Sequence, residues 1–164
     1  MNKTWDLKSS SYSTDTFYAV KPVLEKIFNC EIKNCEGTPL DFKYCIDAVF
    51  VDDNGNCNEG IAFRAQRKLY KTFSIRYKKS FGKTMKTEYD KLMDPSVKIK
   101  PKYHVQVFDA GGFFVIGVIP TSDLIDYMTI NNLDIKTNPD GSQFVVIPWH
   151  DLKVQGYYIK AYRM

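Results

Sequence analysis

Two alternating apolar segments joined by a polar turn constrain the fold of this chain more than any other feature. Residues 43–51 (KYCIDAVFV) and residues 61–68 (IAFRAQRK) alternate side chains as strands do, and residues 52–56 (DDNGN) are typical of a turn. We therefore expect an antiparallel hairpin. Asp47 lies in its first strand, and Gln66 and Lys68 share one face of its second strand. The hairpin would place an acid beside a polar residue and a lysine.

The remaining segments predict a single α+β domain, with a central mixed β-sheet flanked by helices (a mixed-sheet α/β arrangement). Ser13, Thr14 and Asp15 can cap a helix that runs to about residue 29, whereas residues 30–41 contain either a short strand or a loop. The order of helices and strands is that of an α+β chain. Strands over 103–108 and 113–119 should form a second hairpin around Ala110-Gly111-Gly112. The other expected elements are strands over 73–77, 144–147 and 157–162, helices over 87–93 and 121–130, a helical turn over 149–152 and an exposed loop over 80–86.

Bulk composition excludes several classes of protein. The chain has 44% hydrophobic and 26% charged residues, and no window approaches the roughly 20 apolar residues of a membrane span. The first residues lack the apolar core of a secretory signal, so a cytoplasmic protein is expected. If the compact, lysine-rich chain is encoded by a phage, its compartment is the host cytoplasm. Four cysteines at spacings without a CxxC pair predict free thiols rather than structural zinc.

Positive charge is concentrated in one segment. Residues 67–102 carry twelve Lys or Arg and three acids, a net charge of +9, whereas both flanking segments are net negative. Aromatic residues are interleaved with these cations, a mixture that suits binding to DNA or RNA, because cations neutralise phosphates and rings stack on bases. The alternative is a solvated face whose aromatic residues belong to the core. The candidate nucleic-acid contacts are Arg64, Arg67, Lys71, Arg76, Lys78, Lys79, Lys83 and Lys86.

The predicted hairpin resembles the active-site region of the PD-(D/E)xK nuclease superfamily, which includes restriction endonucleases and Holliday-junction resolvases. The resemblance covers about residues 14–80. Asp47 matches the aspartate of the motif, Gln66 occupies the position of the second acid, and Lys68 matches the lysine. A restriction-endonuclease-like core with Mg²⁺ or Mn²⁺ is thereby implied, and Asp47, Gln66 and Lys68 would form the catalytic set.

The sequence departs from that motif in two ways. No proline precedes Asp47, and the amide of Gln66 supplies one negative charge fewer than the carboxylate it replaces, although hard cations favour carboxylates. Another acid would have to compensate. The candidates are Glu25, Asp41 and Glu88, and the metal set taken forward is Asp47, Gln66 and Glu25.

Three functions follow from these observations. The first is metal-dependent cleavage of DNA or RNA. The second keeps the nuclease-like fold without catalysis, as a nucleic-acid-binding protein or a phage inhibitor of host defence. The third is a structural or assembly protein whose basic segment docks on an acidic surface of a protein partner or a second copy of the chain. Spacings of glycine and acidic residues exclude a P-loop and an EF-hand, and His104 and His150 are expected to be structural.

Overall fold

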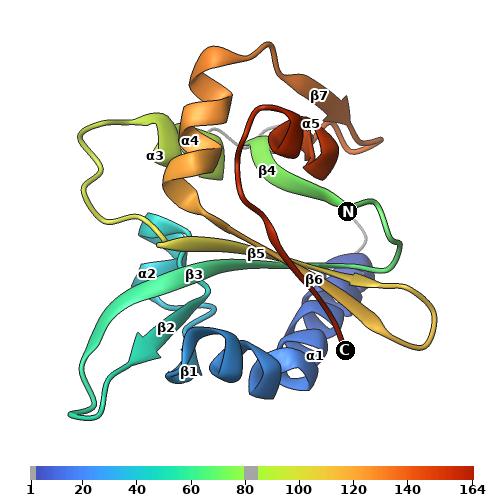
Figure 1. The fold of residues 1–164 in the computed structure, drawn as a ribbon. Coiled ribbons are helices and arrows are strands. Elements are labelled where there is room, and N and C mark those ends of the chain that lie inside the picture. The colour runs from blue at the N-terminus through green and yellow to red at the C-terminus, as the bar shows by residue number, and fades with distance from the viewer. Residues whose placement is uncertain (1–2, 80–84) are drawn as a thin grey trace.

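The computed structural model describes residues 3–79 and 85–164, which form an α+β structure of two sheets with five helices (Figure 1). The helices are α1 (Lys3–Phe28), α2 (Pro39–Tyr44), α3 (Glu88–Met93), α4 (Thr121–Ile130) and α5 (Trp149–Val154). The strands are β1 (Glu31–Asn34), β2 (Ala48–Val51), β3 (Cys57–Gln66), β4 (Thr72–Lys78), β5 (Tyr103–Asp109), β6 (Phe114–Pro120), β7 (Asp134–Thr137), β8 (Gln143–Pro148) and β9 (Lys160–Arg163).

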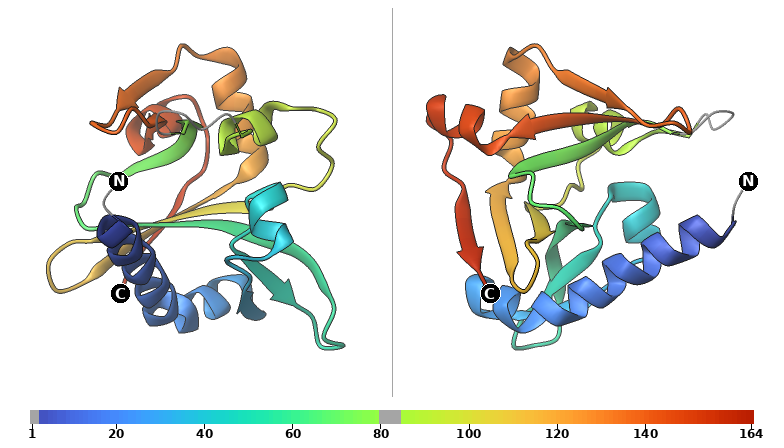
Figure 2. Two further views of the ribbon diagram at one scale, coloured as in Figure 1. Left: turned by 180° about the vertical axis from the view of Figure 1, so that it is seen from behind. Right: turned by 90° about the vertical axis from the view of Figure 1, so that its right-hand side faces the viewer.

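The larger sheet is mixed and has the strand order β1-β2-β3-β5-β6-β9. Strands β3 and β5 run parallel, with Ile61 opposite Tyr103 and Gln66 opposite Phe108, and the other neighbours are antiparallel. The smaller sheet is antiparallel and has the order β4-β8-β7. Helix α1 runs along one face of the larger sheet, and the smaller sheet with α3, α4 and α5 stands over the other face (Figures 1 and 2).

Side-chain alternation in β3 and β5 divides the apolar core between the two faces of the larger sheet. Ile61 and Val105 point toward α1, where they pack with Leu24. Phe17 of that helix meets Phe63 of β3 edge to face, with ring centroids 5.3 Å apart. The alternate residues of β3 and β5, on the face away from α1, point toward the smaller sheet. They are therefore available to line a site between the sheets.

The second core lies between the two sheets and centres on the buried indole of Trp149. The ring packs against Phe73 of β4 and Phe108 of β5, with centroid separations of 5.8 and 5.6 Å. Gly117 of β6 allows the indole to approach the larger sheet. A Cβ at that position would lie 2.1 Å from Cζ2 of Trp149, so a residue larger than glycine would have to displace the indole or the strand.

The predicted strand over residues 43–51 is wrong in its first half. Pro39 begins the short helix α2, which extends through Tyr44, and Cys45 then adopts a left-handed conformation with φ 58°. Only Ala48–Val51 pair with β3. The alternation of polar and apolar residues continues through the helical turn, so the pattern did not reveal the break.

Other predicted helices and strands were confirmed, and the bounds of some of them were corrected. The hairpin of β5 and β6, the helix α3 and the helix α4 were confirmed. Strand β1 resolves the open choice within residues 30–41 in favour of a strand, and β3 ends at Gln66, two residues earlier than predicted. Strand β7 was missed, because all four of its residues are exposed and show no alternation. Most of the expected loop over 80–86, namely residues 80–84, lies outside the described residues.

The first helix and the last strand also differ in extent from the prediction. Helix α1 begins at Lys3, well before the predicted capping residues, and β9 begins at Lys160 rather than residue 157.

None of the helices in the described residues is long and apolar enough to cross a membrane.

Candidate functional site

A cavity of about 450 Å³ lies on the face of the larger sheet that the smaller sheet covers. Alternate residues of β3 (Ala62, Arg64) and of β5 (His104, Gln106) form its floor, because they point away from α1. Residues of β4 and α3 complete the wall on one side, and α2 with the residue Asp47 completes it on the other. The cavity therefore brings together segments that are far apart in the sequence.

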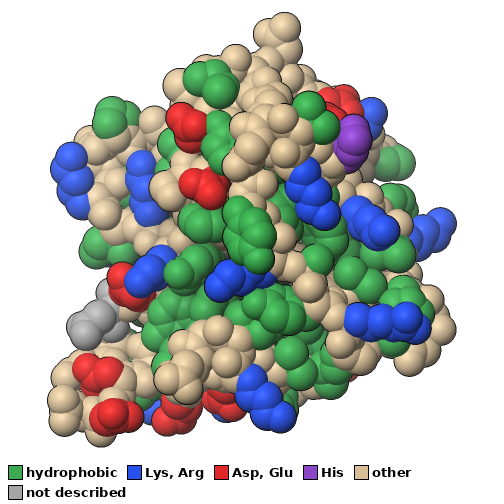
Figure 3. Space-filling model, in the orientation of Figure 1, with side chains coloured by type: hydrophobic (Ala, Val, Ile, Leu, Met, Phe, Trp, Pro, Cys, Tyr) green, Lys and Arg blue, Asp and Glu red, His purple; other side chains and the backbone are tan. Residues whose placement is uncertain are grey.

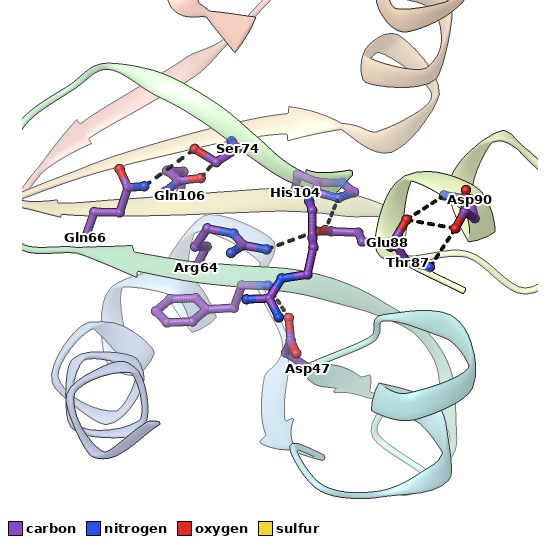
Figure 4. A network of polar contacts seen from close by, with 11 residues as sticks. Asp47, Arg64, Gln66, Ser74, Thr87, Glu88, Asp90, His104 and Gln106 are labelled. Carbon is purple, nitrogen blue, oxygen red and sulfur yellow. Dashed lines mark hydrogen bonds and ion pairs between the residues drawn. The ribbon is translucent and has the colours of Figure 1, made fainter. Parts of the chain in front are cut away.

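Glu88 is the centre of a polar network in this cavity (Figure 4). Its Oε2 accepts hydrogen bonds from the Arg64 guanidinium at 2.9 Å and from the backbone N–H of Arg76 at 3.0 Å. Its Oε1 lies 3.2 Å from Nε2 of His104. A capping box between Thr87 and Asp90 begins α3 and so fixes Glu88 in the first turn of that helix.

The environment of Glu88 keeps it ionised. Burial by itself raises the pKa of this carboxyl group, which is 10% exposed. The charge of Arg64, the hydrogen bond and charge of His104 and the Arg76 N–H together outweigh burial and hold the pKa at about 2. Because an ionised carboxylate only accepts, Nε2 of His104 is the donor in their contact. Nδ1 of His104 lies 2.9 Å from the Thr121 hydroxyl, so both ring nitrogens have partners.

Asp47 lies at the opposite wall, immediately before β2. Its backbone N–H donates to the Ile61 carbonyl, and its Oδ2 accepts from the backbone N–H of Phe63 at 2.7 Å. Burial raises the pKa of Asp47 to about 8, even though the Phe63 N–H favours the charged form; Asp41 and Glu88 also raise it and Arg64 lowers it. Asp47 is therefore mostly protonated and neutral at pH 7.

The structure does not bring Gln66 and Lys68 to Asp47. Gln66 lies three residues beyond Phe63 on β3, which corresponds to roughly 10 Å of strand. Its amide Nε2 is 3.5 Å from the Ser74 hydroxyl, and Lys68 is exposed after the end of β3. The antiparallel register explains the separation: Gln66 would face residue 43 if β2 continued, but that residue belongs to α2.

Glu25 also lies apart from Asp47. It is on α1, where it accepts from the Ile32 N–H at 3.0 Å and pairs with Lys21 at 3.0 Å. The set Asp47, Gln66 and Glu25 thus does not converge, and in residues 3–79 and 85–164 no group of three or more His, Cys, Asp or Glu could hold a metal ion. Of the acids considered as compensating ligands, Asp41 and Glu88 do line the cavity with Asp47.

Half of the candidate nucleic-acid contacts line the cavity, namely Arg64, Arg76, Lys79 and Lys86. Lys91 of α3 joins them, although it was not among the candidates. The guanidinium groups of Arg64 and Arg76 each lie 5.2 Å from the centroid of the Phe144 ring. The cations of the basic segment therefore gather from β4, α3 and the chain before α3.

The other candidate contacts lie elsewhere. Arg67 stacks on the Tyr12 ring at 4.5 Å, Lys71 and Lys78 are exposed and are not among the described lining residues, and Lys83 is outside the described residues. On the face seen in Figure 3, Lys and Arg side chains are spread among hydrophobic ones, while acidic side chains gather over the turn between β2 and β3. The Lys and Arg side chains therefore do not form one continuous block on that face.

Two large apolar side chains stand at the cavity while remaining open to solvent. Phe42 of α2 is 62% exposed and Met85 is 68% exposed. Cys45 also lines the cavity, but burial raises the pKa of its thiol to about 12. It stays protonated and is a poor nucleophile.

His104 and Gln106 were not predicted as site residues. The available signal was their position in the strand sequence YHVQVF, where two polar side chains alternate with apolar ones in a strand that is almost completely buried. Such residues need polar partners inside the protein. No protein-family model matches this chain, and no curated protein or solved structure matches it either.

Proposed function

We propose that this protein binds nucleic acid, with the phosphates of the bound strand held at the cavity by Arg76, Lys79, Lys86 and Lys91. The observation that carries this proposal is that these four cations, all from the +9 segment, line the same cavity. Phosphodiester binding depends on such cations, because each neutralised phosphate releases counterions.

The balance of charge around the cavity favours an anion. Its lining contains five Lys or Arg residues and the four carboxyl groups of Glu36, Asp41, Asp47 and Glu88. Since burial raises the pKa of Asp47 to about 8, that group carries little charge at pH 7. Three carboxylates then face five cations, and the lining has a net positive charge.

The apolar residues at the cavity favour a nucleic-acid strand with unpaired bases as the ligand, rather than a rigid duplex. Phe42 offers an exposed ring and Met85 an exposed thioether beside the same cations. A base can stack on the exposed Phe42 ring, and stacking on an aromatic side chain contributes about 1–3 kcal/mol per base. Single-stranded DNA or RNA is therefore the ligand that best fits both the charge and the exposed apolar groups.

A salt series on matched variants tests the proposal. The double variant Lys79→Ala with Lys86→Ala should bind fluorescent DNA and RNA oligonucleotides more weakly than the wild type. The slope of log affinity against log salt should fall by about one unit for each lost contact. The control is Lys153→Ala with Lys160→Ala, which removes the same charge from exposed positions on α5 and β9. Equal affinities and slopes for the two double variants would overturn the proposal.

Metal-dependent cleavage is a second candidate function, because the carboxyl groups of Asp41, Asp47 and Glu88 line one cavity. These three groups do not form a ready ligand set, since no group of three such residues in the described part of the chain is arranged to hold a metal ion. The two oxygens of Glu88 are already engaged by Arg64, His104 and the Arg76 N–H, so Asp47 and Asp41 are the acids better placed to hold Mg²⁺ or Mn²⁺. The raised pKa of Asp47 means that a cation would have to displace its proton. Cleavage would then depend on pH as well as on the metal.

A further inference from the structure

Three neutral polar side chains follow one another from Gln66 of β3 to Ser74 of β4 and Gln106 of β5, and the last two form part of the cavity wall (Figure 4). Ser74 and Gln106 both line the cavity and are buried, with Gln106 only 2% exposed. This wall differs from the rest of the lining, where Lys, Arg, Asp and Glu residues predominate among the polar groups.

The orientation of the Gln106 amide is fixed by a hydrogen bond. Its Oε1 accepts from the backbone N–H of Ser74 at 3.3 Å, so Nε2 is the group left to donate. That Nε2 is buried and has no partner among the described residues, and the same is true of Oε1 of Gln66. A buried polar group without a partner costs about 1–3 kcal/mol. One donor and one acceptor thus stand unused on neighbouring strands.

We propose that this wall is a subsite for one unpaired nucleobase, read through Gln106 and Ser74. The inference rests on the proposed function and assigns a position to one base of the bound strand. The edge of each nucleobase presents hydrogen-bond acceptors, and most edges pair an acceptor with a donor, which matches a neutral amide and hydroxyl wall. Phosphates are anionic and match the Lys and Arg residues that line the same cavity.

Size and polarity agree with this assignment. A volume of about 450 Å³ lies within the usual range of roughly 300–1,000 Å³ for small-molecule pockets. Ala62 and Phe73 are apolar members of the same lining, and a planar base requires such surface. Ordered water is the competing occupant, because it too would satisfy Gln106 and Ser74.

The first experiment uses the wild-type protein. Affinities are measured for six-nucleotide homopolymers of each base and for an abasic strand with the same phosphates. At least one homopolymer should bind about fivefold or more tighter than the abasic strand, with a similar salt slope. Equal affinities for all strands would overturn the base subsite and leave the proposed function standing. Binding of none of the strands would overturn both.

The second experiment assigns the effect to the wall. Gln106→Met and Ser74→Ala should reduce affinity for the preferred homopolymer toward that of the abasic strand, and leave the abasic strand unaffected. The control is Ser142→Ala, a buried serine near the start of β8 that is not among the described lining residues. Ser74→Ala retains the backbone N–H that Gln106 accepts from, so it remains informative if Gln106→Met does not fold. Ratios unchanged from wild type in the folded variants, or equal losses for both strands, would overturn the inference.

Discussion

Arg64 and Glu88 form an ion pair of 2.9 Å between the end of β3 and the first turn of α3. The same carboxylate accepts from the Arg76 N–H of β4 and contacts His104 of β5. A single side chain therefore ties α3 to one strand of the smaller sheet and two strands of the larger sheet.

Replacing Glu88 by Gln should destabilise the protein by roughly 2–4 kcal/mol at pH 7, because Arg64 and His104 lose a largely buried charged partner. Denaturant unfolding measures the change. Glu59→Gln is a matched control, since its pair with Lys102 is exposed and should contribute less than about 1 kcal/mol. A Glu88→Gln variant as stable as the control would contradict the role of this network.

The way in which the free energy of unfolding falls at acidic pH should also change in Glu88→Gln. The pKa of Glu88 is lowered from 4.5 to about 2, so the folded state binds fewer protons than the unfolded state between these values. The contribution of Glu88 to stability is therefore complete above pH 4.5 and is lost as the pH falls through 2. Glu88→Gln should show a flatter decline than the wild type in this window, and parallel curves would count against the shift.

Asp47→Asn should have the opposite pH dependence. The pKa of Asp47 is raised from 3.8 to about 8, chiefly by burial, so the wild-type protein loses stability as the pH rises from about 4 to 8. The Asn side chain keeps an acceptor for the Phe63 N–H. We expect the variant to be more stable than the wild type by at least about 1 kcal/mol at pH 9, and similar in stability at pH 4. Unfolding curves that differ equally at both pH values would contradict this prediction.

Gly117→Ala should destabilise the protein by roughly 1–3 kcal/mol, because its Cβ would overlap the buried Trp149 indole. The penalty should be smaller by about 1 kcal/mol in a Trp149→Phe background, which removes the overlapping part of the ring. Trp149→Phe also removes an indole N–H that lacks a partner among the described residues. A double-mutant cycle by thermal or denaturant unfolding measures the coupling, and strictly additive effects would refute it.

Calorimetry with Mn²⁺ tests the second candidate function. If Asp47 holds the ion, the apparent affinity should increase as the pH rises toward about 8 and should be lost in Asp47→Asn. Lys68→Ala should leave any metal-dependent cleavage unchanged, because Lys68 is exposed after the end of β3. Metal binding that is unaltered by Asp47→Asn would exclude this aspartate as a ligand.

Sequence patterns predicted those helices and strands whose signals lie within the element itself or in the adjoining turn. The turn Ala110-Gly111-Gly112 lies between two apolar segments, and it gave the β5–β6 hairpin correctly. Thr87 and Asp90 likewise carry the capping signal of α3 within a few residues. Strand β7 had no such signal, because its pairing with β8 leaves its four residues exposed.

The composition of the site depends on the pairing register between strands, and a local sequence pattern does not specify that register. Asp47 and Glu88 both lie in the cavity because β2 pairs with β3 near Ile61 and α3 packs beside β4. Matching Asp47 to Gln66 by alternation alone assumed that the first strand continues through residues 43–47, where the chain instead forms α2 and a left-handed turn. The basic segment was visible in composition, but only the fold shows which of its cations share a cavity.

The parallel pairing of β3 with β5 has a consequence for how the protein folds. Residues 67–102 must leave the larger sheet and return to it, and within this excursion β4 pairs with β8 from near the end of the chain. Neither sheet can therefore be completed from neighbouring residues alone, and such non-local pairing slows folding. Because the cavity walls come from both sheets, the cavity exists only once both have assembled. An occupant would protect the whole molecule against unfolding, so an upward shift of the melting temperature would report its binding.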